Sequence, residues 1–146
     1  MKADGWRAIA AKNQAVTVEV TTASGNVYTA KVTLKVTQSN VKITAAKSAT
    51  YYAEANIAEI PFAISDESVN IGNVSLTSVK MGSKKLDVSD FSCDYGYYNG
   101  PIIQLQSDND LSEYKDKTLT CTFEITPYGM ASNKKPAKVT VNVVIK

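Results

Sequence analysis

The chain has 146 residues, 44% of them hydrophobic, and its sixteen basic and fourteen acidic side chains give a formal net charge of +2. A charge this small argues against nucleic acid or an anionic membrane as the partner, and the length suits one domain or a domain with part of another. Histidine is absent and there are only two cysteines, which excludes a Ser-His-Asp or Cys-His catalytic site and an all-thiolate zinc site within this chain.

Apolar and polar residues alternate with a period of two along most of the chain, which predicts strands with one buried and one exposed face. Turn signals separate them at Ala23–Asn26, Met81–Ser83 and Asn99–Pro101. No helical stripe of apolar residues interrupts the pattern, so we expect an all-β protein. In chain order, the expected strands lie at Val16–Thr21, Val32–Val36, Val41–Ala45, Ile57–Ile64, Val74–Lys80, Phe91–Tyr95, Ile102–Gln106, Leu119–Ile125 and Val139–Ile145.

The first predicted hairpin, Lys12–Val36, resembles a second one near the end of the chain, Lys117–Val143. Glu19 corresponds to Glu124 at an offset of 105 residues (124 − 19). Beyond the turn, the motif Lys-Val-Thr beginning at Lys31 recurs at an offset of 107 (138 − 31), after two extra turn residues. A repeat of this size is typical of one β-sandwich domain.

The repeat predicts two domains. We expect residues 1–37 to be the C-terminal strands of a truncated β-sandwich repeat, and residues 38–146 to be a complete sandwich. The connector Thr37–Asn40 is short and lacks Pro and Gly, which favours a stiff joint. An isolated hairpin is marginal in water, so the N-terminal hairpin is expected to pack on its own domain or self-associate with the hairpin of another chain.

The two closing hairpins, AVTVEVTTASGNVYTAKVTLKV and TLTCTFEITPYGMASNKKPAKVTVNVVI, are rich in Lys, Thr and Val. In these segments the chain resembles the immunoglobulin-like or fibronectin-like repeat modules of Gram-positive bacterial surface proteins. The resemblance implies an antiparallel β-sandwich in a secreted or cell-surface tandem array that displays or spaces other domains.

The strongest candidate binding site is the segment DYGYYNGP, which contains Tyr95, Tyr97 and Tyr98. Aromatic faces stack on flat ligands such as sugar rings, and Asp94 and Asn99 are available to bond sugar hydroxyls. The alternative is that Tyr95 is a core residue and the other two tyrosines cap the edge of the sandwich, a common structural use of tyrosine.

Cys93 and Cys121 both fall in the inward phase of their predicted strands. A disulfide across the core is one interpretation, which an extracellular location allows. The other is two buried thiols that act as small apolar side chains, and the match of Cys121 with Val16 in the first hairpin supports it.

Two further groups of residues admit a chemical role and a simpler one. The acidic stretch Asp108–Asp110, with Glu113 and Asp116, offers oxygen ligands for Ca²⁺, but its spacing departs from an EF-hand and favours a solvated turn. Some Gram-positive pilin and adhesin domains cross-link a lysine to an asparagine, which here suggests Lys42 and Asn142 with Glu124 as the acid. Asn142 lies in the outward phase, which argues against this bond.

Together these features predict a non-catalytic structural, spacer or adhesion module of a secreted or cell-surface multidomain bacterial protein, with no metal or other cofactor. The alternative is a carbohydrate-binding module that uses the tyrosine loop. The expected partners are neighbouring domains of the parent protein, with a glycan or a host or cell-wall protein as further candidates. No apolar run is long enough to insert in a membrane.

Overall fold

The structure, a computed structural model, describes residues 13–35, 41–130 and 133–146. The chain divides into two compact units. Unit 1 comprises residues 1–40 and 129–134, and unit 2 comprises residues 41–128 and 135–146. The expected joint at Thr37–Asn40 lies outside the described residues.

Unit 1 contains an antiparallel hairpin of β1 (Asn13–Thr21) and β2 (Val27–Lys35). The turn between them is closed by Thr22, whose carbonyl accepts a hydrogen bond from the amide of Gly25 (2.9 Å). Gly25 has a φ of +84°, a conformation that glycine adopts without steric cost. The register pairs Val18 with Ala30 and places apolar side chains on one face of the hairpin, in agreement with the predicted alternation.

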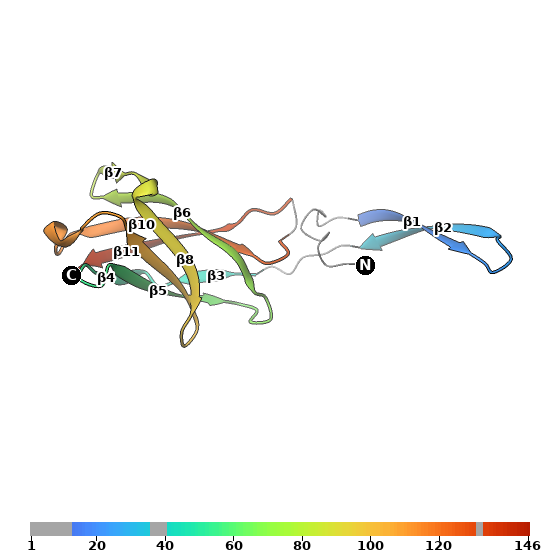
Figure 1. The fold of residues 1–146 in the computed structure, drawn as a ribbon, viewed down its shortest axis with the longest axis horizontal. Coiled ribbons are helices and arrows are strands. Elements are labelled where there is room, and N and C mark those ends of the chain that lie inside the picture. The colour runs from blue at the N-terminus through green and yellow to red at the C-terminus, as the bar shows by residue number, and fades with distance from the viewer. Residues whose placement is uncertain (1–12, 36–40, 131–132) are drawn as a thin grey trace. The chain divides into compact units, whose positions relative to one another are not determined.

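Unit 2 is built from nine strands and two short 3₁₀ helices, and no α-helix occurs among the residues that the structure describes (Figure 1). The strands are β3 (Ile43–Ala45), β4 (Ser48–Tyr52), β5 (Ile57–Ile64), β6 (Ile71–Met81), β7 (Lys84–Leu86), β8 (Phe91–Tyr97), β9 (Pro101–Ser107), β10 (Thr118–Pro127) and β11 (Ala137–Ile145). The 3₁₀ helices are η2 (Val88–Asp90) and η3 (Ser112–Tyr114).

The strands of unit 2 form one curled sheet, with the order β7-β6-β10-β11-β4-β5-β9-β8 and β3 paired to β5. The neighbours are antiparallel except β4 and β11, which run parallel. The curl brings β8 close to β6. The thiol of Cys93 on β8 donates a hydrogen bond to the carbonyl of Val74 on β6 (3.8 Å). The first two strands of unit 2 pair with different parts of this sheet: β3 pairs with β5, and β4 pairs with β11.

The core lies inside this curl and is formed by alternate residues of the long strands. β10 shows the pattern most clearly, since Leu119, Cys121, Phe123 and Ile125 are all fully buried while the residues between them are not. The other fully buried side chains come from every layer of the curl: Tyr51, Ala58, Ile60, Val79, Ile103, Leu105, Val141, Val143 and Ile145. The predicted alternation thus supplies a core that the two halves of the sheet share.

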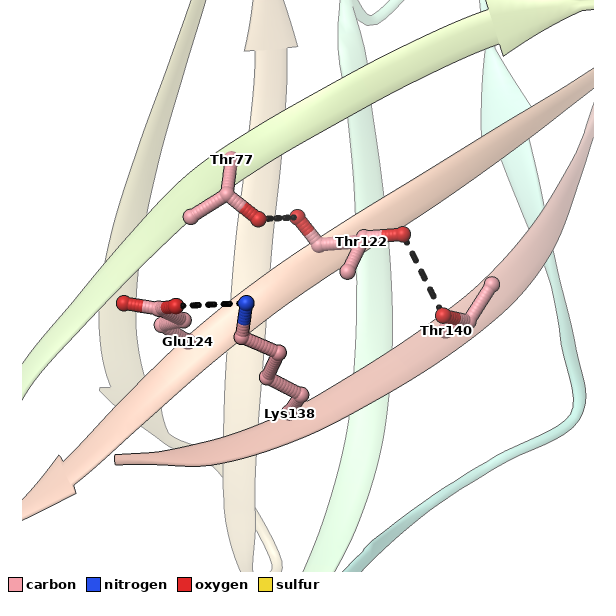
Figure 2. Close-up of polar contacts among 5 residues, drawn as sticks. All are labelled: Thr77, Thr122, Glu124, Lys138 and Thr140. Carbon is pink, nitrogen blue, oxygen red and sulfur yellow. Dashed lines mark hydrogen bonds and ion pairs between the residues drawn. The ribbon is translucent and has the colours of Figure 1, made fainter. Parts of the chain in front are cut away.

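The outer face of β6, β10 and β11 carries a ladder of polar contacts (Figure 2). The hydroxyls of Thr122 and Thr140 lie 3.2 Å apart across β10 and β11, and Lys138 forms an ion pair with Glu124 (3.1 Å). Thr77 occupies a bulge in β6, and its hydroxyl donates to the carbonyl of Thr122 (3.1 Å). Exposed ion pairs contribute little stability, so the main role of these polar side chains is to keep the outer face of the sheet hydrated.

Two strands were not predicted. β4 was missed because its sequence, SATYY, is polar and short, although Tyr51 is fully buried. β7 was not predicted because it has only three residues, two of which are the charged Lys84 and Lys85, and these lysines lie on the edge strand that follows the predicted turn Met81–Ser83. Lysine is common on edge strands because it discourages pairing with other chains.

The register of the two similar hairpins differs from the sequence match. Val16 pairs with Val32 in the first hairpin, whereas its counterpart Cys121 pairs with Val141 in the second. Val32 therefore corresponds in register to Val141 and not to Val139, so the second turn is effectively four residues longer. A shift of two residues keeps every side chain on the same face, which explains how the pattern survives the change.

Candidate functional site

One end of the curl in unit 2 holds a pocket of about 690 Å³ that includes part of the predicted tyrosine segment. This volume is within the range of small-molecule sites. The end of β8 supplies Tyr95 and Tyr97, the turn after it supplies Asn99, and the end of β5 with the loop after it supplies the facing wall. The complete lining is Phe62, Ala63, Ile64, Glu67, Val69, Asn70, Tyr95, Tyr97, Asn99, Gly100 and Pro101.

Strand alternation positions the two pocket tyrosines. Tyr95 and Tyr97 follow the inward phase of β8 that begins with Phe91 and Cys93, which pack against the core. Beyond Cys93 the inner face opens, and Tyr95 is 39% exposed while Tyr97 is 77% exposed. The ring of Tyr95 contacts that of Phe62 with centroids 6.1 Å apart and planes tilted by 54°. This geometry is a favourable aromatic pair, and it anchors Tyr95 to the buried end of β5.

A tight turn holds Tyr97 in place. Tyr97 pairs with Pro101 across the hairpin, and the amide of Tyr98 donates to the carbonyl of Gly100 (2.9 Å). Asn99 has a φ of +50° and Gly100 a φ of +129°, conformations that asparagine and glycine tolerate better than other residues. The sequence Asn-Gly-Pro therefore closes this loop and directs Asn99 to the pocket rim.

The structure divides the five predicted binding residues. Tyr95, Tyr97 and Asn99 line the pocket, whereas Tyr98 and Asp94 do not. Tyr98 is exposed at the tip of the turn, and Asp94 falls in the outward phase of β8, between Cys93 and Tyr95. The facing wall was missed, because its members come from β5 and the loop after it, more than twenty residues away in sequence. No local motif links Phe62, Glu67 and Asn70 to the tyrosine turn.

Tyr51 has a structural role. Its fully buried side chain donates a hydrogen bond to Oδ1 of Asn56, and its hydroxyl accepts one from the amide of Ser107 (3.1 Å). Burial raises the pKa of this phenol, partly offset by the Ser107 hydrogen bond. Tyr51 therefore ties β4 to the β4–β5 turn and to β9, while Tyr52 and Tyr128 are exposed.

The two cysteines are free thiols in the structure. The register places Cys121 opposite Val79, whereas the Cys93 thiol lies at the level of Val74. Val74 and Val79 are five residues apart on β6 (79 − 74), which is roughly 16 Å at about 3.3 Å a residue. A disulfide needs Cα atoms about 4.4–6.8 Å apart. Burial raises the pKa of both thiols, that of Cys121 to about 12. The structure therefore describes two separate, protonated thiols and does not contain the predicted disulfide.

Two of the candidate calcium ligands, Asp110 and Asp116, have other partners. The Asp110 carboxylate accepts a hydrogen bond from the amide of Ser112 (2.8 Å), and that contact lowers the pKa of Asp110. Asp116 pairs with Lys146, which lowers the pKa of Asp116. Within residues 13–35, 41–130 and 133–146, no group of three His, Cys, Asp or Glu side chains is placed to hold a metal ion.

The residues of the hypothetical lysine–asparagine cross-link are also not together. Asn142 is exposed and accepts a hydrogen bond from the hydroxyl of Thr120 (3.2 Å), while Glu124 pairs with Lys138. Thr120 and Glu124 are four residues apart on β10, roughly 13 Å along the strand. The proposed acid therefore lies far from the asparagine it would have to activate.

In the portion of the chain described by the structure, no helix has the length and apolar character needed to cross a membrane. Comparison of the chain with family models, with curated proteins and with solved structures found no match.

Proposed function

We propose that unit 2 is an immunoglobulin-like β-sandwich that serves as a load-bearing spacer or adhesion module in a secreted or cell-surface multidomain protein. Its strand order supports this fold. In an immunoglobulin sandwich one sheet has the order A-B-E-D and the other contains C-F-G. When β4 and β7 are set aside as additional strands and the other seven are lettered A to G along the chain, the paths β3-β5-β9-β8 and β6-β10-β11 give the same orders.

The fold departs from antibody domains in two features. Those domains carry a disulfide between strands B and F and a tryptophan on strand C. Here β5 has no cysteine and β6 has no tryptophan. The position that corresponds to the second disulfide strand, β10, instead contributes Cys121, Phe123 and Ile125 to an apolar core. Stability is therefore expected to come from packing and from the strand ladders.

The parallel pairing of β4 with β11 is the observation that carries the spacer function. Asn142 pairs with Ser48 and Ile145 with Tyr51, so β4, near the start of unit 2, and β11, its last strand, run side by side in the same direction. Two further backbone bonds close the far end, between Lys146 and Tyr51 (2.8 Å) and between Ala53 and Lys146 (3.0 Å).

This pairing determines how unit 2 meets a pulling force. Because β4 and β11 are parallel, the chain enters unit 2 at one end and leaves at the other, as Figure 1 shows for β3 and the C-terminus. Tension between Val41 and Lys146 therefore acts along both strands and loads their hydrogen bonds together, in shear. A spacer under tension between two neighbouring domains would use this geometry.

Single-molecule force spectroscopy tests the proposal by changing the direction of pull. In one variant the handles are attached at residues 41 and 146. In the other they are attached at residue 55, in the β4–β5 turn, and at residue 146, which lies beside that turn. The second geometry separates β4 from β11 one bond at a time. We expect a clearly higher unfolding force in the first geometry, and equal forces in the two would contradict a load-bearing role.

A further inference from the structure

The pocket at the β8–β9 turn combines an apolar floor with a polar rim. Phe62, which belongs to the buried core, is the most buried residue of the lining, and Tyr95 packs on it. Pro101 pairs with Tyr97 on the adjacent strand, so aromatic and proline rings continue outward from the core. Such a surface buries the C–H face of a flat ligand, which is the usual chemistry of small-molecule sites with few polar groups.

The exposed aromatic ring of Tyr97 requires an explanation. At 77% exposure it is the most exposed of the tyrosines that line the pocket, yet its backbone is fixed by the hairpin and by the Tyr98–Gly100 bond. Holding a tyrosine in a rigid turn reduces the entropy that a ligand would otherwise have to remove on binding. The ring is therefore prepared for stacking without being needed for the core.

The polar groups at the rim are available to a ligand. Within the described part of the chain, no hydrogen bond or ion pair engages the side chains of Glu67, Asn70 and Asn99. Together they offer carboxylate and amide oxygens as acceptors and amide nitrogens as donors. Hydroxyl groups, which both donate and accept, match this set.

The charge of the lining limits the ligand further. Glu67 is the single charged residue in the lining, and neither Lys nor Arg is among its members. A carboxylate, sulfate or phosphate on the ligand would meet a negative charge with no cation to balance it. The site is thus suited to a neutral ligand, and less suited to an acidic sugar.

We infer that this pocket binds a pyranose ring of a neutral glycan, which stacks on Tyr97 and bonds through its hydroxyls to Glu67, Asn70 and Asn99. This site would add an adhesive activity to the proposed spacer and does not depend on it. The predicted binding site included both Tyr97 and Tyr98, and the inferred site includes Tyr97 alone of these two, because Tyr98 does not line the pocket.

Tyr98 provides a matched control. Tyr97 ends β8 and Tyr98 begins the turn after it, and the two are 77% and 71% exposed, but Tyr97 lines the pocket and Tyr98 does not. The experiment is affinity electrophoresis of the whole chain, Tyr97→Ala and Tyr98→Ala through native gels. The gels contain β-glucan, xylan or galactomannan as neutral probes, and polygalacturonate as an acidic probe. Equal melting temperatures of the three proteins show that the variants remain folded.

We expect at least one neutral gel to retard the whole chain, Tyr98→Ala to bind as well, and Tyr97→Ala to bind about tenfold more weakly, the loss of one aromatic contact. Retardation in the acidic gel alone would indicate attraction of the basic chain and overturn the inference. An equal loss in both variants would contradict the pocket as the site, because Tyr98 does not line it. Absence of retardation in every neutral gel would also overturn it and favour a protein segment as the occupant, while the force measurement would be unaffected.

Discussion

Replacing Tyr51 with phenylalanine tests how the parallel strand β4 is held in unit 2. The phenol hydroxyl accepts the amide hydrogen of Ser107 at 3.1 Å and donates to Asn56. Tyr51→Phe keeps the ring and its packing but leaves the buried amide of Ser107 without this partner. An unsatisfied buried donor costs about 1–3 kcal/mol, so we expect the free energy of unfolding to fall by that amount.

The assay is equilibrium unfolding in urea at pH 7, followed by near-ultraviolet circular dichroism. With an m value of about 1–3 kcal/mol/M, the midpoint should fall by on the order of 1 M at unchanged m. Tyr52→Phe is the control, because the side chain of Tyr52 is 58% exposed. Removal of its hydroxyl should change the free energy of unfolding by less than about 0.5 kcal/mol. If the two variants lose equal stability, the hydrogen bonds of Tyr51 do not support β4 as described.

Three further results are expected. Phe123→Ala should lower the free energy of unfolding by about 3–5 kcal/mol, since this ring is fully buried; a loss below about 1 kcal/mol would contradict a packed core. The raised pKa of Cys121, about 12 against 9.0, favours the thiol in the folded state, so stability should decline as pH rises from 9 towards 12, and Cys121→Val should lessen the decline; an unchanged pH profile would refute this. Val18→Lys, on the apolar face of the first hairpin, should reduce self-association in sedimentation measurements, whereas Thr17→Lys on the opposite face should not; a monomeric parent chain would exclude that partner.

The first hairpin exposes the apolar face on which the self-association prediction depends. Val20, Tyr28 and Val32 are 56%, 62% and 42% exposed, whereas most side chains on the inward face of β10–β11 are buried in the curl. The same alternation therefore produces a core in one unit and an exposed apolar face in the other. Self-association through this face remains a proposal that the sedimentation measurement decides.

The strands with strong alternation could be predicted from the sequence, because burial of one face imposes a period of two wherever the strand is long. β5 was predicted with its observed bounds, Ile57–Ile64, and β10 within a few residues. β4 was not, since its place is set by a parallel partner at the other end of the chain and by the buried Tyr51. Local composition carries no record of such a long-range pairing.

The candidate pocket was predicted only in part for the same reason. The phase of β8 was correct for Cys93, and the turn at Asn99–Pro101 was recognised from its Asn-Gly-Pro sequence. Whether a tyrosine in this turn lines a pocket depends on the loop after β5, which the fold brings to the opposite side. Tyr98 and Tyr97 are alike in sequence terms, and the register of β8 with β9 distinguishes them.

The central claim, that unit 2 is closed by the parallel pairing of β4 with its last strand, β11, is tested most directly by amide hydrogen exchange measured by NMR. The amide of Asn142 donates to the carbonyl of Lys47 (3.1 Å), and that of Ala53 donates to the carbonyl of Lys146 (3.0 Å). Both should exchange as slowly as the β10–β11 ladder, and far more slowly than the turn amide of Tyr98, because they open only when the core opens. Exchange of Asn142 and Ala53 at the rate of Tyr98 would show that β4 is not locked to β11, and would contradict the load-bearing account.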